Sequence, residues 1–420
     1  MKNKILLIFL LSLITQSFLY SQWIQQSVPV DKPISGIEFV NANTGWAVTE
    51  RFTNMDTSYI LYTSNGGTNW NIQYFGNFRL YCLNVINENI VYAGGTGGGT
   101  AKLFKSSNGG VNWINMNIGV STGIDDMFFV NADSGYICDA LSASVHTTTD
   151  GGISWIQRPH PVQSPKVLFF LNYDTGYCGG GGEIFKTINA GLNWNYLNNL
   201  GVGGRQILSI QFLNNDKGWV GLTNNRIGLT TNGGFNWTLI MPNTIGSYEI
   251  HGLYFLTDSI GWCGPDISAS IYKTLNGGLN WTTQNTNIWG SRTIQFLDSL
   301  TGWSAFFPIS KTTNGGVTFI RGLNTEIANT FKLYQNYPNP FNPNTKIRFT
   351  ITKNSDVTIS VYNILGKEVF NWRSDGNLNK GIYEYEFIPD NLSSGVYIYK
   401  LTAKSDGNVF SDSKKMIYLK

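Results

Sequence analysis

The sequence predicts an all-β protein, a seven-bladed β-propeller followed by a small antiparallel β-sandwich, and two repeated patterns support this prediction. An eight-residue box, Ser/Thr-x-Asn/Asp-Gly/Ala-Gly-x-x-Trp/Phe, occurs seven times between Thr63 and Phe319, at intervals of 38 to 44 residues. An apolar run with an aligned residue, usually Phe, precedes each copy. A period of about 40 residues indicates an array in which each unit buries its apolar face against its neighbours.

Each unit contains four expected strands, which we letter A to D. Strand A ends near the aligned residue, strand B begins at Gly-Trp or Gly-Tyr in most units, strand C precedes the box and strand D follows it. Four short antiparallel strands per unit are typical of a propeller blade. The aligned residues are Phe39, Val85, Phe129, Phe170, Phe212, Phe255 and Phe296.

The box is predicted to form the turn between strands C and D. Its Asn or Asp side chain is expected to accept hydrogen bonds from the backbone one and two residues on. Its second glycine suits a positive φ, and its final aromatic residue fills the gap between blades. Because the box serves every unit alike, we assign it a structural role. The box residues are Asn65, Gly67, Trp70, Asn108, Gly110, Trp113, Asp150, Gly152, Trp155, Asn189, Gly191, Trp194, Asn232, Gly234, Trp237, Asn276, Gly278, Trp281, Asn314, Gly316 and Phe319.

These residues resemble the Asp-box (BNR) repeat of sialidases and sortilin-like propellers, with Asn in place of Asp in six copies. Together with the Gly-Trp strands, residues 23 to 323 look like the photosystem II stability/assembly factor family of seven-bladed propellers. This resemblance implies the shape. A sialidase would also need the motif Phe-Arg-Ile-Pro, and Phe78-Arg79-Leu80-Tyr81 departs from it.

The ring has one candidate D strand too many, because Trp23-Ile24-Gln25 also has the pattern of a D strand. We expect this N-terminal segment to complete the last blade, since that removes an open sheet edge. The alternative closing strand is the segment 318–323, which follows the aberrant box ending in Phe319.

Both ends of the chain carry expected targeting segments. Residues 1–21 have two lysines and an apolar run, which indicate a signal peptide cleaved between Ser21 and Gln22. Residues 331 to 420 include Tyr337-Pro338-Asn339-Pro340-Phe341-Asn342-Pro343 and Val361-Tyr362-Asn363-Ile364-Leu365-Gly366, and they look like a type A C-terminal sorting domain of the type IX secretion system. That resemblance implies contact with the secretion machinery, export across the outer membrane, and release or surface attachment.

The predicted domains are therefore a signal peptide (1–21), a propeller (22–324), a linker (325–336) and an immunoglobulin-like sorting domain (337–420). The mature chain has no apolar run of about 18 residues, so no membrane-spanning segment is expected. A net charge of +3 without a Lys/Arg cluster argues against nucleic-acid partners. Cys82, Cys138, Cys178 and Cys263 fall on separate strands, which favours buried free thiols and leaves one disulfide as the alternative.

Strand parity divides the loops between two faces. The A–B turns and the boxes share one, the box face, and the B–C and D–A loops share the other, the open-loop face. The open-loop face has the longer loops, and binding residues concentrate on such loops. Near its channel mouth the strands carry candidate ligand-binding residues: Tyr81, Asp125, Lys166, His251 and Arg292, with Ser35 and Leu208 at the equivalent positions and Arg79, His160, Tyr248 and Trp289 as further candidates.

Two functions remain open. The favoured one is a secreted or cell-surface propeller that binds a protein or glycan; the alternative is a carbohydrate-active enzyme that pairs Asp125 with Asp56 or Asp266. No catalytic residue, metal site or cofactor is assigned, because His146, His160 and His251 are not at metal-ligand intervals. The run Gly94 to Gly99 is expected to form a flexible B–C loop, since no helix follows it to bind a phosphate.

Overall fold

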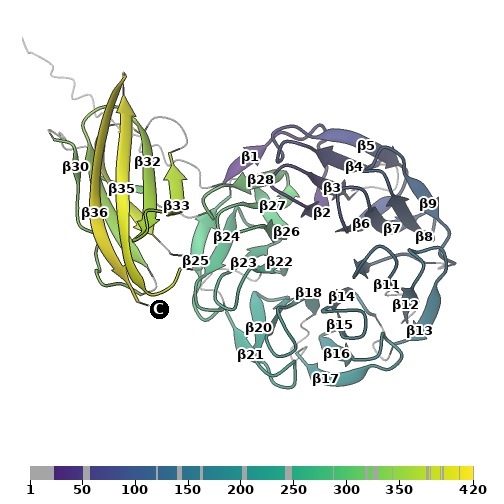
Figure 1. Cartoon of the computed structure of the whole chain (residues 1–420). Coiled ribbons are helices and arrows are strands. Elements are labelled where there is room, and N and C mark those ends of the chain that lie inside the picture. The colour runs from purple at the N-terminus through teal and green to yellow at the C-terminus, as the bar shows by residue number, and fades with distance from the viewer. Residues whose placement is uncertain are drawn as a thin grey trace, which may run out of the picture.

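The computed structural model describes residues 23–419, except for 51–56, 120–121, 140–143, 161–163, 201–205, 242–247, 287, 317–319, 325–329, 343, 375–377, 379, 388, 390–391 and 406. The predicted signal peptide with its Ser21/Gln22 cleavage site, the box residue Phe319 and Asp56 lie outside the described residues. The described part consists of strands in nine four-stranded sheets, seven in a ring and two in a separate sandwich (Figure 1). None of its elements is a helix able to cross a bilayer.

The seven sheets of the ring are blades of four antiparallel strands, with strand A innermost and strand D outermost (Figure 1). Blade by blade, in the order A to D, the strands are β2 (Ile34–Phe39), β3 (Gly45–Thr49), β4 (Ser58–Thr63) and β5 (Asn71–Gly76); β6 (Arg79–Val85), β7 (Val91–Gly97), β8 (Thr100–Ser106) and β9 (Ile114–Met116); β10 (Asp126–Phe129), β11 (Gly135–Asp139), β12 (Ser144–Thr148) and β13 (Ile156–Pro159); β14 (Val167–Phe170), β15 (Gly176–Gly180), β16 (Glu183–Thr187) and β17 (Asn195–Asn199); β18 (Ile207–Phe212), β19 (Gly218–Leu222), β20 (Arg226–Thr230) and β21 (Thr238–Ile240); β22 (Ile250–Phe255), β23 (Gly261–Pro265), β24 (Ser270–Thr274) and β25 (Thr282–Asn285); and β26 (Trp289–Phe296), β27 (Gly302–Phe307), β28 (Ile309–Thr312) and β1 (Ile24–Gln26).

The N-terminal strand closes the ring, as the sequence predicts. β1 pairs with β28 in antiparallel register, from Ile24 opposite Lys311 to Gln26 opposite Ile309. Trp23, which precedes β1, is fully buried and packs edge-on against Phe296, with ring centroids 5.7 Å apart. In other blades the Trp of the box holds this position, for example Trp70 against Phe39 at 5.8 Å. Trp23 therefore replaces the box aromatic of the seventh blade. This blade combines β26, β27 and β28 from the C-terminal end of the propeller with β1 from its N-terminal end.

The box forms the predicted C–D turn, but its hydrogen bonds differ from the expected ones. In the first copy the Thr63 hydroxyl accepts the N–H groups of Asn65 and Gly67, at 3.3 and 2.9 Å. The Asn65 carboxamide oxygen instead accepts the N–H of Asn69, four residues on, at 2.9 Å. The Ser/Thr hydroxyl thus serves the near donors in this copy, where the prediction for the Asn side chain was wrong; in the last copy Asn314 Oδ1 does accept the N–H of Gly316, two residues on, at 3.1 Å. The positive φ of the second glycine, 92° at Gly67, is confirmed.

A hydrogen bond ties each box to the A–B turn of its own blade, which confirms that both lie on one face. The fourth residue of the box donates its N–H to a carbonyl of that turn, as Gly66 does to Asn43 at 2.7 Å. The equivalent pairs are Gly109–Asn89, Gly151–Asp133, Ala190–Asp174, Gly233–Asp216, Gly277–Ser259 and Gly315–Leu300.

Aromatic stacking between blades forms the core of the ring. The Trp or Tyr that opens strand B stacks on the aligned Phe of the following blade, as Trp219 does on Phe255 with centroids 3.7 Å apart. The same pairing occurs at Tyr92–Phe129, Tyr136–Phe170, Tyr177–Phe212, Trp262–Phe296 and Trp303–Phe39. Such pairs add about 1 kcal/mol each beyond the area they bury.

The first two blades meet differently because Val85 stands where the other blades have Phe. There the indole N–H of Trp46 donates to Gln73 Oε1 at 3.0 Å, and Gln73 Nε2 donates to the carbonyl of Gly109 at 2.8 Å. Gln73 thus bridges Trp46 to the box of the second blade, whereas Trp219 donates directly to the Gly277 carbonyl of the next box at 2.9 Å. All four cysteines are buried and free, as predicted.

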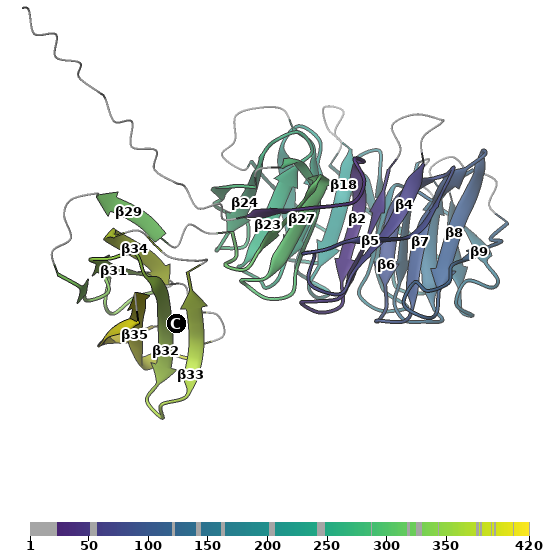
Figure 2. The ribbon, with the colours of Figure 1, turned by 90° about the horizontal axis from the view of Figure 1, so that it is seen from above.

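The C-terminal sandwich packs one sheet of β29 (Ile320–Asn324), β34 (Gly381–Phe387), β31 (Thr345–Ile351) and β30 (Lys332–Leu333) on a second of β33 (Glu368–Arg373), β32 (Asp356–Asn363), β35 (Gly395–Ser405) and β36 (Asn408–Tyr418). β29 pairs with β34, and Figure 2 shows it in this smaller domain. Residues 320–324 thus join the sandwich rather than the ring, which rules out the alternative closing strand. The sandwich also includes β30, within the segment 325–336 that the sequence suggested as a linker.

Candidate functional site

The open-loop face brings two of the five predicted ligand-binding residues together. His251 is the second residue of strand A of the sixth blade, and Arg292 lies on strand A of the seventh, the next blade in the ring. The other three occupy separate blades: Tyr81 is on β6, Asp125 precedes β10, and Lys166 precedes β14. Lys166 is exposed, and its ammonium lies 3.4 Å from Gln206 Oε1. The face therefore has one polar corner rather than a ring of equivalent ligands.

Several other candidate residues contribute to packing. The Ser35 hydroxyl donates to the carbonyl of Leu80 at 2.8 Å, which links the first two blades. His160 is buried, with its ring edge-on to Trp194 at 4.7 Å. The carbonyl of Tyr248 accepts the N–H of Asn225 at 2.6 Å. Trp289, in contrast, is 65% exposed at the start of β26.

The glycine run from Gly94 differs from the expected flexible loop. β7 extends to Gly97 and β8 begins at Thr100, so only Gly98 and Gly99, both with positive φ, form the turn. A Cβ on Gly95 would lie 1.8 Å from the carbonyl oxygen of Arg79. The prediction was wrong here because glycine serves close strand packing in β7.

Arg292 is held in place by two contacts. Its Nη1 lies 3.3 Å from Glu50 Oε2, at the end of strand B in the first blade. Its guanidinium also lies over the ring of Phe306, 4.3 Å from the centroid. The side chain keeps about a third of its surface exposed, at 34%. An Arg fixed in this way keeps part of its side chain accessible for a ligand, although its Nε is buried.

Three potential metal ligands gather beside Arg292. Donor atoms of Glu249, His251 and Asp266 all lie within 4.8 Å of one another, and His251 Nε2 is 3.1 Å from Glu249 Oε2. Burial lowers the pKa of His251 below its usual value, which Glu249 opposes and Arg292 reinforces. Sequence spacing missed this cluster because the fourteen residues between His251 and Asp266 form a hairpin. The pairing of Ile250 with Pro265 brings its ends together.

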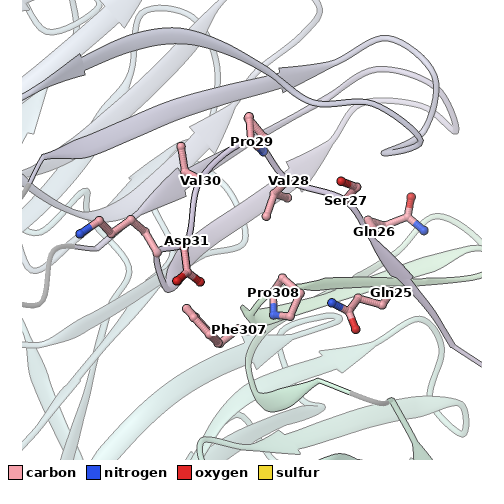
Figure 3. Close-up of a pocket in the computed structure, with 10 residues that line it drawn as sticks. Gln25, Gln26, Ser27, Val28, Pro29, Val30, Asp31, Phe307 and Pro308 are labelled. Atoms are coloured by element: carbon pink, nitrogen blue, oxygen red, sulfur yellow. The ribbon is translucent and has the colours of Figure 1, made fainter.

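A pocket of about 460 Å³ opens between the first and last blades on the same face (Figure 3). The D–A connection and the turn at Phe307 and Pro308 line it on two sides, as Figure 3 shows. Trp289, which is exposed, is the strand partner of Phe307, one of the residues that line this pocket. The lining residues are Gln25, Gln26, Ser27, Val28, Pro29, Val30, Asp31, Lys32, Phe307 and Pro308.

The box face also exposes apolar side chains. The residue after the second glycine of the box is an exposed apolar side chain in five copies, namely Val111, Ile153, Leu192, Phe235 and Leu279. They occur once per blade, whereas the pocket gathers apolar and polar residues in one place. Singly scattered apolar residues are normal on a surface.

The two described carboxylates proposed for a hydrolase, Asp125 and Asp266, lie on different blades. Asp125 belongs to the third blade, whereas Asp266 follows β23 in the sixth and lies with Glu249 and His251. In the segment Phe78-Arg79-Leu80-Tyr81, which departs from the sialidase motif, Phe78 is buried against Phe104, with ring centroids 4.7 Å apart. Phe78 therefore contributes to packing between strands.

The ring and the sandwich define the class of protein: a β-propeller with a C-terminal β-sandwich. Residues 335–418 match the family model of the secretion system C-terminal sorting domain. The chain is thus a propeller protein with a sorting domain of the type IX secretion system. The comparison with curated proteins found no match.

Solved propellers share the fold. The structure of YCF48 bound to D1 peptide has a TM-score of 0.58 at 14% identity, covering 70% of this chain and 96% of that one. YCF48 from Cyanidioschyzon merolae has a TM-score of 0.54 at 17% identity, with coverages of 70% and 98%. PorZ of Porphyromonas gingivalis, a surface component of the type IX secretion system, has a TM-score of 0.53 at 11% identity and covers 94% of this chain and 60% of that one. Identities this low establish the fold alone.

Proposed function

We propose that this chain is a secreted or cell-surface binding protein, exported by the type IX secretion system, whose open-loop face captures an extracellular protein. The observation that carries this proposal is that strand β26 carries both the exposed Trp289 and the anchored Arg292, and that its partner strand β27 ends at Phe307, which lines the pocket. Exposed aromatic and arginine side chains beside a pocket are the residue types that dominate binding energy in protein interfaces.

The lining of the pocket supports a protein ligand over a glycan. Val28, Pro29, Val30 and Pro308 offer apolar surface, and the cavity of about 460 Å³ has the size of a typical ligand site. One large apolar side chain of a partner would fit against this surface, while Gln25 and Gln26 offer hydrogen bonds to its backbone. The solved neighbour bound to a peptide, noted above, uses the same fold and is consistent with this choice.

The binding test uses the mature chain against a panel of extracellular proteins and a glycan array, with a parallel assay for released reducing sugar. The proposal predicts capture of a protein without turnover, and weaker capture by Trp289→Ser and Arg292→Ala. Sugar release that Asp125→Asn abolishes would instead establish the enzyme.

The export test fuses residues 320–420, which include β29 and all partners of its sheet, to a periplasmic reporter. In a host with a type IX system the reporter should reach the cell surface or the medium. A reporter that stays in the periplasm would contradict the export claim. A shorter fusion from residue 337 lacks β29 and β30 and should be exported less efficiently, because the sandwich loses two strands.

A further inference from the structure

We propose that Glu249, His251 and Asp266 bind a divalent transition-metal ion, with zinc as the best match to their chemistry. This site stands apart from the proposed protein binding, since it needs neither the pocket nor Trp289. The three donor groups come from one hairpin, β22–β23, at the edge of the channel mouth on the open-loop face.

The distances between the donor atoms suit one ion. Two ligands about 2.1 Å from a tetrahedral zinc ion lie about 3.4 Å apart. His251 Nε2 and Glu249 Oε2 are 3.1 Å apart, and all three donor atoms lie within 4.8 Å of one another. Small side-chain rotations therefore bring all three to bonding distance.

The backbone around the cluster orients two of its members. The N–H of Glu249 donates to Asp266 Oδ1 at 3.3 Å, and the N–H of Asp266 donates to the carbonyl of Glu249 at 3.1 Å. A register shift between Ile250 and Gly252 sets the strand geometry next to these residues. Hydrogen bonds that orient ligating carboxylates, and bulges that redirect side chains, are common at metal and active sites.

The seventh blade holds the Asp266 end of the hairpin. Gly290 has a φ of 81° and donates its N–H to the carbonyl of Ser268 at 3.2 Å. A Cβ at Gly290 would lie 2.1 Å from the carbonyl oxygen of Asp266, so the two blades touch backbone to backbone here. The loop that carries Asp266 is therefore fixed from both sides.

The local charges favour a cation. Glu249 and Asp266 supply two carboxylates, while the nearby Arg292 is 3.3 Å from Glu50 and forms an ion pair with it. A divalent ion would neutralise the two remaining carboxylates. An imidazole nitrogen with two carboxylate oxygens suits zinc, whereas calcium prefers oxygen ligands alone.

The site has room for a further ligand. The side chains of His251 and Glu249 are 26% and 46% exposed, so solvent reaches the donor atoms. Zinc with three protein ligands keeps a position for water or for another molecule. A metal ion here would thus be accessible from the open-loop face.

The test is calorimetric titration of the untagged, EDTA-dialysed mature chain with zinc chloride, followed by melting of each sample with and without zinc. We expect one zinc per chain and a higher Tm with zinc. His251→Gln and Asp266→Asn should each weaken binding by about tenfold or more and remove the Tm increase. Asp258→Asn is the matched control, because Asp258 is an exposed carboxylate of the same blade on the box face.

Three results would overturn the site. They are no heat of binding at millimolar zinc, equal affinity in wild type and both ligand variants, and equal loss in the Asp258→Asn control. The metal-free Tm of each variant shows whether it is folded. If either ligand variant fails to fold, Glu249→Gln, at the most exposed ligand, takes its place under the same criteria.

Discussion

Trp23→Ala should destabilise the propeller strongly, because this one side chain completes the last blade. Trp23 is fully buried, packs edge-on against Phe296, and donates its indole N–H to Gln284 Oε1 at 3.2 Å. Truncation of a buried Trp costs about 3–5 kcal/mol, and the lost donor to the buried Gln284 adds about 1 kcal/mol. We expect a total of about 5 kcal/mol, which is a large share of the stability of a typical domain.

For a domain of roughly 300 residues with an unfolding entropy of about 2.1 cal/mol/K per residue, this loss lowers the Tm by about 8 °C. Differential scanning calorimetry of the mature chain measures it. Ile24→Ala is the matched control, since Ile24 is the next residue, the first of β1, and is 46% exposed. A Tm for Trp23→Ala close to that of wild type, or an equal drop for Ile24→Ala, would refute closure of the ring by β1.

Three further predictions concern a glycine, a titrating carboxylate and the sorting domain. Gly218→Ala should lower the Tm by the equivalent of about 1–3 kcal/mol, because a Cβ there would lie 2.3 Å from the Phe212 ring, whereas Gly395→Ala, whose nearest neighbours are 3.9 Å away, should change it little. Burial raises the pKa of Glu38 from 4.5 to about 7, even though its Oε2 accepts the N–H of Val85. The Glu38 carboxyl group ionises at lower pH in the unfolded chain than in the folded one. The free energy of unfolding of wild type should therefore fall as the pH rises from about 4.5 through 7, by up to about 3 kcal/mol relative to Glu38→Gln. Thermal melting from pH 4 to 8 should show the Tm values of wild type and Glu38→Gln converging at low pH. A Tm difference that stays constant with pH would contradict a raised pKa of Glu38 as the cause. Glu88→Gln, at an exposed carboxylate, is the control. Ile364 and Leu365 are 76% and 86% exposed at a hairpin tip of the sorting domain and should contact the secretion machinery. The double variant Ile364→Ser with Leu365→Ser should therefore reduce export of a fused reporter without changing the Tm of the sorting domain. Unchanged export would exclude this contact.

Repetition made the ring predictable from the sequence. Seven copies of the box count the blades and mark each C–D turn, and the surplus D strand at Trp23 indicates how the ring closes. The positive φ of the second glycine follows from its position in a tight turn, where a Cβ would clash. These features depend on local pattern, which one sequence shows directly.

The features that the sequence did not predict depend on contacts between distant strands. From the sequence alone Gly95 was predicted to lie in a loop, whereas in the structure it lies in β7 with the carbonyl of Arg79 beside it. β29 follows the last box but pairs with β34, which lies far along the chain. His251 and Asp266 meet because the two strands of a hairpin pair with a register shift. Spacing along the chain carries no information on any of these contacts.

The most direct test of the proposed function compares two equally exposed aromatic side chains on opposite faces. Trp289 on the open-loop face and Phe235 on the box face are each 65% exposed. Capture of the extracellular protein found in the panel is measured for wild type, Trp289→Ser and Phe235→Ser. We predict that Trp289→Ser loses at least about tenfold in affinity, as truncation of an interface aromatic does, while Phe235→Ser binds like wild type. Loss of binding in Phe235→Ser with full binding in Trp289→Ser would place the ligand on the box face and contradict the account.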